Sequence, residues 1–210
     1  MALDLKGEFP IFLARHGETT FNVERRWQGA ANDSPLTERG RAQARETGLI
    51  LRDLIDLSNP PHFVASPLGR ARATMEIALE AMGLPRDVYT TDPRLVEIDL
   101  GQWTGMLADE VKERDATRWQ ARQADRWNVP CPGGENFCMA AERAQTWIGG
   151  LDRATAAISH GVFGRILRVL YAGLPWEQIA ALDEPQGCVF RLHEGAIARF
   201  DSARAVPPEV

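Results

Sequence analysis

The stretch Phe9-Pro10-Ile11-Phe12-Leu13-Ala14-Arg15-His16-Gly17-Glu18 decides the fold of this 210-residue chain. Its first six residues form a short apolar run of the kind that is typical of a buried β-strand. Arg15 and His16 come together where this run stops, and Gly17 follows them. Open α/β sheets build their sites at the carboxyl ends of their parallel strands. The stretch therefore predicts a buried strand that brings a basic, reactive pair of side chains to the edge of a sheet.

The composition is that of a globular protein with one large core. Hydrophobic residues make up 44% of the chain and charged residues 25%, both ordinary fractions. The length fits one compact domain, so we expect a single domain over residues 1–210. The net charge of −5, from 24 basic and 29 acidic side chains, argues against a nucleic-acid partner, which would require a basic excess. A few arginines can nevertheless be focused in one cleft.

Cysteine usage and hydropathy indicate the compartment. The three cysteines, Cys131, Cys138 and Cys188, are odd in number and their spacing fits no common zinc pattern, so we expect reduced thiols. The first ten residues include acidic side chains and no long apolar segment, so we expect no signal peptide. No apolar run approaches the ~18 residues that span a bilayer. The sequence therefore predicts a cytoplasmic protein with no membrane partner.

Strand-like and helix-like segments alternate along the chain. We expect extended segments at 9–14, 62–65, 88–91, 95–100, 154–159, 188–192 and 196–200, and helices at 37–56, 68–82, 107–127, 135–151 and 162–171. Ser66 is expected to be the N-cap of the second helix, with Pro67 in its first turn. This alternation predicts a single-domain, three-layer α/β/α sandwich around a mostly parallel sheet, with a hairpin at its end.

Three of the predicted strands end in polar groups of related chemistry. The first ends in Arg15 and His16, the second is followed one turn later by Arg70, and the strand at 154–159 ends in His160. The ends of parallel strands lie on one edge, so these groups can converge on one anion. Arginine forks match the oxygens of a phosphate with paired hydrogen bonds. A single strand-end histidine is often only structural, but the ordered combination favours a phosphoryl site with His16 as the nucleophile.

Motifs from residue 11 to about residue 170 together resemble one family. The segment Leu13-Ala14-Arg15-His16-Gly17-Glu18-Thr19 resembles the signature of the histidine phosphatase superfamily, the phosphoglycerate-mutase-like proteins. The resemblance continues in family order through Asn22, Trp27-Gln28-Gly29, 33–37, Ser66-Pro67-Leu68-Gly69-Arg70, 95–105, Gly133-Gly134-Glu135 and Ser159-His160-Gly161. Within the superfamily, residues 21–29 look most similar to the small cofactor-independent phosphatases of broad specificity.

The resemblance implies a phosphoglycerate-mutase-like fold and a role for each matched residue. His16 would be the nucleophile that forms a phosphohistidine, and Glu97 would donate a proton to the leaving oxygen. The phosphoryl group would be bound by the other matched residues, Arg15, Asn22, Gln28, Gly29, Arg70 and His160. We expect no metal and no cofactor, because guanidinium and imidazole groups supply the positive charge that phosphoryl transfer needs. The expected partner is a small phosphorylated substrate, and a homodimer is a possible assembly.

The proposed reaction requires particular protonation states of the nucleophile and the acid. An imidazole attacks only with a free lone pair, so His16 should be neutral, with its other nitrogen donating to a fixed carbonyl. Glu97 must be protonated to act as an acid, a form that burial or a nearby phosphate would favour. Glu18 and Asp99 are acidic alternatives, and in a strand Asp99 would face the same side as Glu97. A purely structural pairing of Glu97 with an arginine is the other interpretation.

The region of about 104–134, between this acid and the Gly-Gly-Glu loop, is expected to cover the substrate and to determine which one binds. It contains Arg114, Arg118, Arg122 and Arg126, which share one face if the region is a continuous helix and repel one another by a few tenths of a kcal/mol per pair. One hypothesis is that this face attracts acidic substrates. The alternative, which the sequence favours, is a solvated face relieved by neighbouring carboxylates.

Three activities fit these residues. A phosphatase that hydrolyses small phosphate monoesters is favoured, because the chain is short after Glu97, where mutases of the family carry a longer insertion. A phosphoglycerate mutase would return the phosphoryl group to another hydroxyl of the substrate, which requires that water be excluded from the intermediate. A non-catalytic phosphate-binding or regulatory module is the third possibility, and it would have no need of Glu97.

Overall fold

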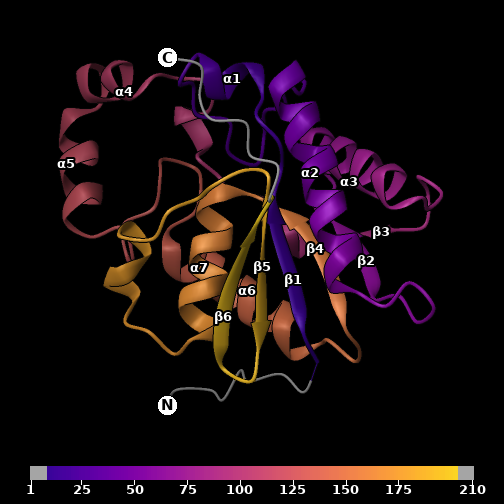
Figure 1. Cartoon of the computed structure of the whole chain (residues 1–210). Coiled ribbons are helices and arrows are strands. Elements are labelled where there is room, and N and C mark those ends of the chain that lie inside the picture. Colours follow the sequence, from indigo (N-terminus) through magenta and orange to yellow (C-terminus); the bar gives the residue numbers. More distant parts are fainter. Residues whose placement is uncertain (1–8, 203–210) are drawn as a thin grey trace.

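Figure 1 shows the computed structural model, which describes residues 9–202 of the chain. The helices are α1 (Thr20–Val23), α2 (Glu38–Leu54), α3 (Gly69–Met82), α4 (Ala108–Arg114), α5 (Ala116–Ala124), α6 (Phe137–Gly149) and α7 (Gly161–Tyr171). The strands are β1 (Ile11–Arg15), β2 (His62–Ala65), β3 (Thr90–Thr91), β4 (Thr155–Ser159), β5 (Cys188–His193) and β6 (Ala196–Asp201). The prediction about a signal peptide concerns a segment that lies largely outside the described residues.

The strands form one sheet in the order β3-β2-β4-β1-β5-β6. The first four strands along the chain pair in parallel, whereas β5 is antiparallel to β1 and β6 is antiparallel to β5. In the pairing of β1 with β4, Arg15 lies opposite Ser159. The residues that follow these two strands therefore meet at one edge of the sheet. The predicted mostly parallel sheet and its closing hairpin are confirmed.

Hydrophobic clusters fill both faces of the sheet and complete the three layers. On one face, Leu13 of β1 belongs to a cluster with Trp147 of α6 and Phe163 of α7. On the other face, Phe12 belongs to a cluster with residues of α2 and α3, among them Met75. Successive residues of β1 therefore point to opposite faces and are buried on both, which explains the uninterrupted apolar run in the sequence. Figure 1 shows the helices around the sheet, and the α/β/α sandwich is confirmed.

Two expected elements differ from the prediction. The helix expected at 107–127 is broken at Asp115, whose φ of −142° and ψ of 54° separate α4 from α5. Aspartate competes with the backbone for hydrogen bonds and so favours helix ends. The segment at 95–100 is not a strand, because its backbone pairs with side chains instead of another strand. The carbonyl oxygen of Val96 accepts from Arg143 Nη1 at 2.9 Å, and Asp99 N donates to Glu135 Oε2 at 2.9 Å.

The N-cap of α3 also differs from the prediction. Ser66 is not its N-cap, because the helix begins only at Gly69, with Leu68 in the capping position. The carboxylate of Asp33, from the loop after α1, accepts from the backbone N–H groups of Gly69 and Arg70 instead. The Ser66 hydroxyl accepts from Leu68 N, at 3.4 Å, and also contacts a side chain of the site. None of the helices between residues 9 and 202 has the length and apolar character needed to cross a membrane.

Candidate active site

The groups predicted at three strand ends meet in one place. His16 directly follows β1, and its backbone N–H donates to Ser159 O at 2.9 Å, which continues the pairing of β1 with β4. His160 is the N-cap of α7, directly after β4, and Arg70 lies in the first turn of α3, after β2. The two imidazole centroids are 5.1 Å apart, and Arg70 Nε lies 3.3 Å from His16 Nε2. The sheet thus brings together the groups that the sequence predicts.

The ring of His16 is held in one tautomer. Its Nδ1 lies 2.8 Å from the carbonyl oxygen of Gly17, which can only accept, so Nδ1 carries the proton and Nε2 keeps its lone pair. The peptide of Gly17 is fixed in turn, because its N–H donates to Thr74 Oγ1 at 3.0 Å. A Cβ at Gly17 would overlap the carbonyl oxygen of Gly40, so only glycine fits there. The geometry therefore provides the fixed carbonyl that a nucleophilic imidazole requires.

Arg70 is a buried cation with most of its donors already engaged. Its Nη2 donates to Gly29 O at 2.8 Å, and its Nη1 donates to Asn32 O at 2.9 Å and to Asp33 Oδ1 at 3.2 Å. These contacts hold the guanidinium plane with Nε facing His16. Burial lowers the pKa of Arg70, and the nearby carboxylates of Glu97 and Asp33 oppose that shift. The side chain is therefore a preorganised positive charge beside the nucleophile.

The second imidazole is oriented by Ser66. His160 Nε2 lies 2.8 Å from Ser66 Oγ, and its Nδ1 is buried without a hydrogen-bond partner among residues 9–202. Burial, reinforced by the positive charges of Arg15 and Arg70, holds the pKa values of both histidines well below 6.5. Both rings are therefore neutral at neutral pH. His160 Nδ1 is the kind of free polar atom that a bound oxyanion could satisfy.

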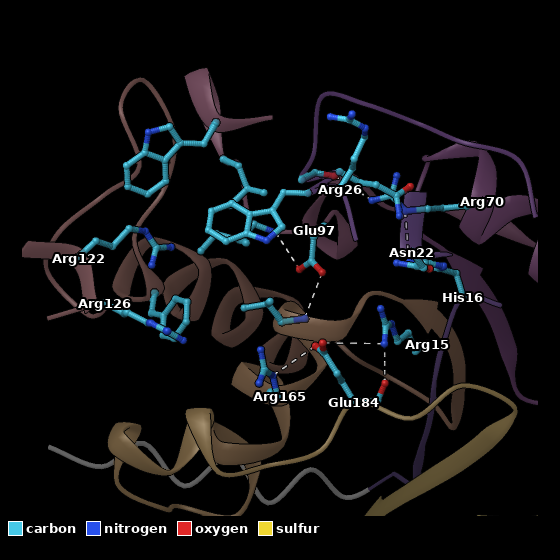
Figure 2. Close-up of a pocket in the computed structure, with 18 of the residues that line it drawn as sticks. Arg15, His16, Asn22, Arg26, Arg70, Glu97, Arg122, Arg126, Arg165 and Glu184 are labelled. Atoms are coloured by element: carbon cyan, nitrogen blue, oxygen red, sulfur yellow. Dashed lines mark hydrogen bonds and ion pairs between the residues drawn. The ribbon is translucent and has the colours of Figure 1, made fainter. Parts of the chain in front are cut away.

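Arg15 is positioned by a residue that the sequence analysis missed. Arg15 Nη1 donates to the backbone oxygen of Glu184 at 2.7 Å, and the carboxylate of Glu184 lies 4.0 Å from the same atom and 3.4 Å from Arg165 Nε. Figure 2 shows Glu184 between these two arginines. A Cβ at Gly161 would overlap the Glu184 carboxylate. Within residues 9–202, Arg15 Nε is buried and has no hydrogen-bond partner.

Asn22, Gln28 and Gly29 all line the same cavity. Asn22 closes a capping box with Thr19 at the start of α1, and its Oδ1 also accepts from Gln186 Nε2 at 3.3 Å. The amide of Gln28 is engaged internally, since its Nε2 donates to Thr19 Oγ1 at 2.8 Å. Gly29 has a φ of 58° and presents its carbonyl oxygen to Arg70. The first loop therefore lines the cavity, largely by supporting other residues, and its contacts with a phosphoryl group stay a prediction.

The carboxylate of Glu97 lies at the N-terminus of α7, the helix whose N-cap is His160. This carboxylate accepts three backbone N–H groups, from Ile98 at 3.0 Å, Val162 at 3.1 Å and Phe163 at 2.9 Å. Two of these donors belong to the first turn of α7, where the helix dipole also favours negative charge. These contacts fix the position of the carboxylate at the start of α7. Figure 2 shows Glu97 in the middle of the cavity that it lines.

The two acidic alternatives lie outside this cavity lining. Asp99 Oδ1 accepts from Gly101 N at 2.8 Å, and Glu18 Oε1 accepts from Thr37 Oγ1 at 2.9 Å. The prediction that Asp99 faces the same side as Glu97 is wrong, because it assumed a strand. The irregular segment is held instead by the Gly-Gly-Glu loop, in which a Cβ at Gly134 would overlap the backbone oxygen of Asp99. Asp99 therefore helps to hold the segment that carries Glu97.

The cavity has a volume of about 310 Å³ and six arginines in its wall. Besides Arg15, Arg70 and Arg165, its lining includes Arg26, Arg122 and Arg126, together with the indole rings of Trp27, Trp103 and Trp119. Arg114 and Arg118 are exposed and lie outside the lining, so the predicted single face of four arginines is wrong. The reason is the break at Asp115 and the end of α5 at Ala124, which separates the four side chains.

The described part of the chain contains no group of three or more His, Cys, Asp or Glu side chains that could hold a metal ion. The positive charge of the cavity comes from its arginines. All three cysteines are free thiols. The site therefore contains a neutral imidazole with a fixed tautomer, several guanidinium groups around it, and the carboxylates of Glu97 and Glu184 in its wall. This arrangement can hold a phosphate and transfer it.

Comparison with known proteins identifies the family to which the chain belongs. A sequence profile of the histidine phosphatase superfamily (branch 1) matches residues 11–196. A protein of Erwinia tasmaniensis named "Probable phosphoglycerate mutase GpmB" is 33% identical over 170 residues, which are 79% of this chain and 75% of that protein. The structure of the alpha-ribazole phosphatase of Shigella flexneri is 27% identical, with a TM-score of 0.78, covering 96% of this chain and 100% of that one.

A mycobacterial glucosyl-3-phosphoglycerate phosphatase, whose structure was determined with VO3, is also similar. It is 27% identical with a TM-score of 0.73, and the match covers 91% of this chain and 96% of that one. The profile covers most of the chain, and these structures share its fold over nearly their whole length. The chain is therefore an enzyme of the histidine phosphatase superfamily, branch 1.

Proposed function

We propose that the protein hydrolyses small phosphate monoesters through a phosphohistidine formed on His16. The observation that carries this proposal is the state of that imidazole. Its Nδ1 proton is fixed by Gly17 O at 2.8 Å, and its pKa is held well below 6.5 by burial and by two arginines. The Nε2 lone pair is thus available at neutral pH beside Arg70. A buried histidine with a merely structural role would not need this neutral form beside two cations.

The phosphoryl group would be held by Arg15, Arg70 and His160. Arg15 Nε and His160 Nδ1 are buried polar atoms with no partner in the described part of the chain, and both can donate to a phosphoryl oxygen. Arg70 Nε lies 3.3 Å from His16 Nε2 and donates to it. When the attack begins, Arg70 Nε would donate to a phosphate oxygen instead. Asn22, Gln28 and Gly29 would close the same pocket from the first loop. Such positioning and positive charge are what phosphoryl transfer requires.

The first half-reaction exchanges one bond to phosphorus for another. The lone pair of His16 Nε2 forms the P–N bond, and the P–O bond to the leaving group breaks with its electron pair on the leaving oxygen. Protonated Glu97 donates its proton to that oxygen, so an alcohol departs. The negative charge of the dianionic phosphate bound beside Glu97 favours the protonated form that this step requires.

The second half-reaction returns the enzyme to its starting state. Ionised Glu97 removes a proton from a water molecule, whose oxygen attacks phosphorus while the P–N bond breaks and its electron pair returns to His16. Orthophosphate leaves, and Glu97 is again protonated. The phosphatases among the structural relatives favour this outcome over the mutase reaction that one relative's name indicates. The free thiols support a reducing compartment, and we place the enzyme in the cytoplasm.

A panel of phosphate esters tests the proposal, assayed for orthophosphate in the presence of EDTA. We expect release from several esters, undiminished by EDTA and abolished in His16→Ala. Isomerised esters without orthophosphate would instead identify a mutase. Tight binding of the esters with no turnover would identify a binding module. A loss of activity with EDTA that added metal restores would contradict the metal-independent mechanism.

A further inference from the structure

A second group of arginines lines the cavity away from the proposed nucleophile. Figure 2 shows Arg122 and Arg126 at one side of the cavity, His16 at the other, and Glu97 between them. Arg122 belongs to α5 and Arg126 to the turn that follows it, both within the region of 104–134. A phosphoryl group bound next to His16 would therefore not contact these two side chains. They remain available to contact the far end of the substrate.

Neither of these arginines has a carboxylate partner in the part of the chain that the structure describes. Arg122 is buried, with its Nε 3.0 Å from Cys131 Sγ and its guanidinium 5.4 Å from the ring centroid of Phe137. Burial raises the pKa of the Cys131 thiol, so this sulfur is neutral at neutral pH and supplies no counter-charge. Arg126 Nη2 donates to the amide oxygen of Gln123. Within residues 9–202, neither guanidinium forms an ion pair.

The other arginines that line the cavity do form ion pairs. Arg26 Nη1 lies 3.5 Å from Glu110 Oε2, Arg70 Nη1 lies 3.2 Å from Asp33 Oδ1, and Arg165 Nε lies 3.4 Å from the Glu184 carboxylate. The lack of partners is not a shortage of acids, since the chain has 29 acidic and 24 basic side chains. Burying a guanidinium without a counter-charge is unfavourable, and Arg122 and Arg165 add repulsion at Arg126. The fold thus keeps uncompensated positive charge at this end.

We propose that Arg122 and Arg126 bind a second anionic group, a carboxylate, on the leaving group of the substrate. The inference rests on the proposed phosphatase reaction and names the class of ester that it acts on. The planar guanidinium fork matches a carboxylate with two hydrogen bonds. The rings of Trp27 and Trp119, stacked with centroids 5.6 Å apart, line the wall of the cavity and can pack against the carbon skeleton between the two anions.

Matched pairs of esters test this site. One pair is 3-phosphoglycerate and glycerol 3-phosphate, which differ in a carboxylate on a short flexible skeleton. The other is 4-carboxyphenyl phosphate and phenyl phosphate, which differ in a carboxylate at the far end of a flat ring. We expect kcat/KM to favour the carboxylate in at least one pair by about tenfold or more, the effect of one charge-assisted interaction. Added salt should reduce this preference.

Substitutions connect the preference to the two arginines. Arg122→Gln and Arg126→Gln should each reduce the ratio of kcat/KM within the preferred pair by about tenfold. The change of ratio between variants cancels any difference in leaving-group chemistry within a pair. Arg118→Gln is the matched control, because Arg118 is an exposed arginine one turn from Arg122 on α5 and lies outside the cavity lining. Its ratio should equal that of the unchanged enzyme.

The outcomes separate this inference from the proposed function. Equal kcat/KM within both pairs, or a preference that survives in both variants, would overturn the carboxylate site while hydrolysis itself stands. Arg122 is buried, so if Arg122→Gln does not fold, the half-buried Arg126 decides the question. If no ester is hydrolysed, the proposed function fails, and calorimetric affinities for the same pairs still test the arginines. Tighter binding of the acidic member in either pair would then support the site.

Discussion

The two histidines at the centre of the site are nearly inaccessible, with 3% of His16 and 1% of His160 exposed. Burial lowers both pKa values well below the ordinary 6.5, and neighbouring arginines add to the shift. In the unfolded chain these groups bind protons below pH 6.5, whereas in the folded chain they stay neutral until a much lower pH. The unfolded state thus gains protons first, and stability is lost as the pH falls below 6.5.

This linkage predicts a pH dependence of folding. The free energy of unfolding should be insensitive to these groups above pH 7 and should fall by up to about 1.4 kcal/mol per pH unit for each histidine below pH 6.5. Denaturant unfolding between pH 7.5 and 5 measures it. In His16→Asn the slope should be roughly halved. A free energy of unfolding that stays constant between pH 6.5 and 5 would show that the histidines are protonated in the folded protein.

Glu184 gives a second prediction at the residue scale. Its carboxylate lies 4.0 Å from Arg15 Nη1 and competes with a phosphate for that arginine, whereas its backbone oxygen holds the arginine in place. Glu184→Gln removes the charge and keeps the backbone contact. Inhibition by orthophosphate should strengthen about fivefold, which is ~1 kcal/mol for a partly exposed pair. Weaker inhibition would mean that the carboxylate is needed to orient Arg15.

Residue by residue, the sequence was most informative where a motif coincided with a strand end. Arg15, His16 and His160 could be placed because each comes at the end of an apolar strand. Glu184 could not, because it lies in an irregular segment and contacts Arg15 across 169 positions of the chain. Asp33 begins the matched segment 33–37, but its capping of α3 depends on how the loop folds back. Such contacts exist only once the tertiary structure has formed.

At the scale of elements, the N-terminus of α7 and Glu97 form one unit. Glu97→Gln keeps the shape of the cap but has no proton to donate. Hydrolysis of alkyl phosphates should fall by roughly 10²–10⁴-fold, the usual contribution of a general acid. Hydrolysis of p-nitrophenyl phosphate should fall far less, because its leaving oxygen needs little protonation. Stability should drop by about 1 kcal/mol through the weaker cap.

The ratio of the two rates distinguishes a proton donor from a structural cap. If both substrates lost activity equally in Glu97→Gln, the side chain would act only by holding α7 and the segment before it. A plot of kcat/KM against the pKa of the leaving group, made for both proteins, measures this directly. The proposed role requires a much steeper dependence in the variant than in the unchanged enzyme.

Several elements could be predicted from the sequence, and others could not. The helix expected at 37–56 is α2, which begins after Thr37, whose hydroxyl accepts from Gly40 N at 3.0 Å as an N-cap. The break between α4 and α5 was missed because helical periodicity continues on both sides of Asp115. The segment at 95–100 has a strand-like composition, but Arg143 and Glu135 provide its hydrogen-bond partners. Periodicity reveals an element but does not reveal what competes for its backbone.

On the scale of the whole molecule, the region of 104–134 differs from the rest in its packing. Val111 and Cys131 of this region form a small cluster with Trp103, against which Trp27 and Trp119 pack. Of its tryptophans, only Trp127 packs against the core that α6 and α7 share with the sheet. The alternation of strands and helices predicted the two cores on the faces of the sheet from the sequence. The small cluster could not be predicted, because nothing in the chain indicates which tryptophans meet.

This packing predicts uneven stability. Amides of α4 and α5 should exchange with solvent at least about 100-fold faster than those of β1 and β4, because fewer buried contacts resist their opening. A bound phosphate ester with a carboxylate should slow exchange in α5, where Arg122 lies. Hydrogen exchange read by mass spectrometry measures both. Equal protection across α5 and β1 would show that the region of 104–134 unfolds only together with the sheet.

The central claim is that phosphorus becomes bonded to His16, and trapping that bond tests it most directly. Enzyme mixed with a rapidly hydrolysed ester should be quenched in base within one turnover and digested for mass spectrometry. We predict a phosphoryl group on the peptide that contains His16, stable in base, lost in acid, and absent from His16→Ala. Turnover with an unmodified His16 at every time point, or a phosphoryl group on another residue, would contradict the account.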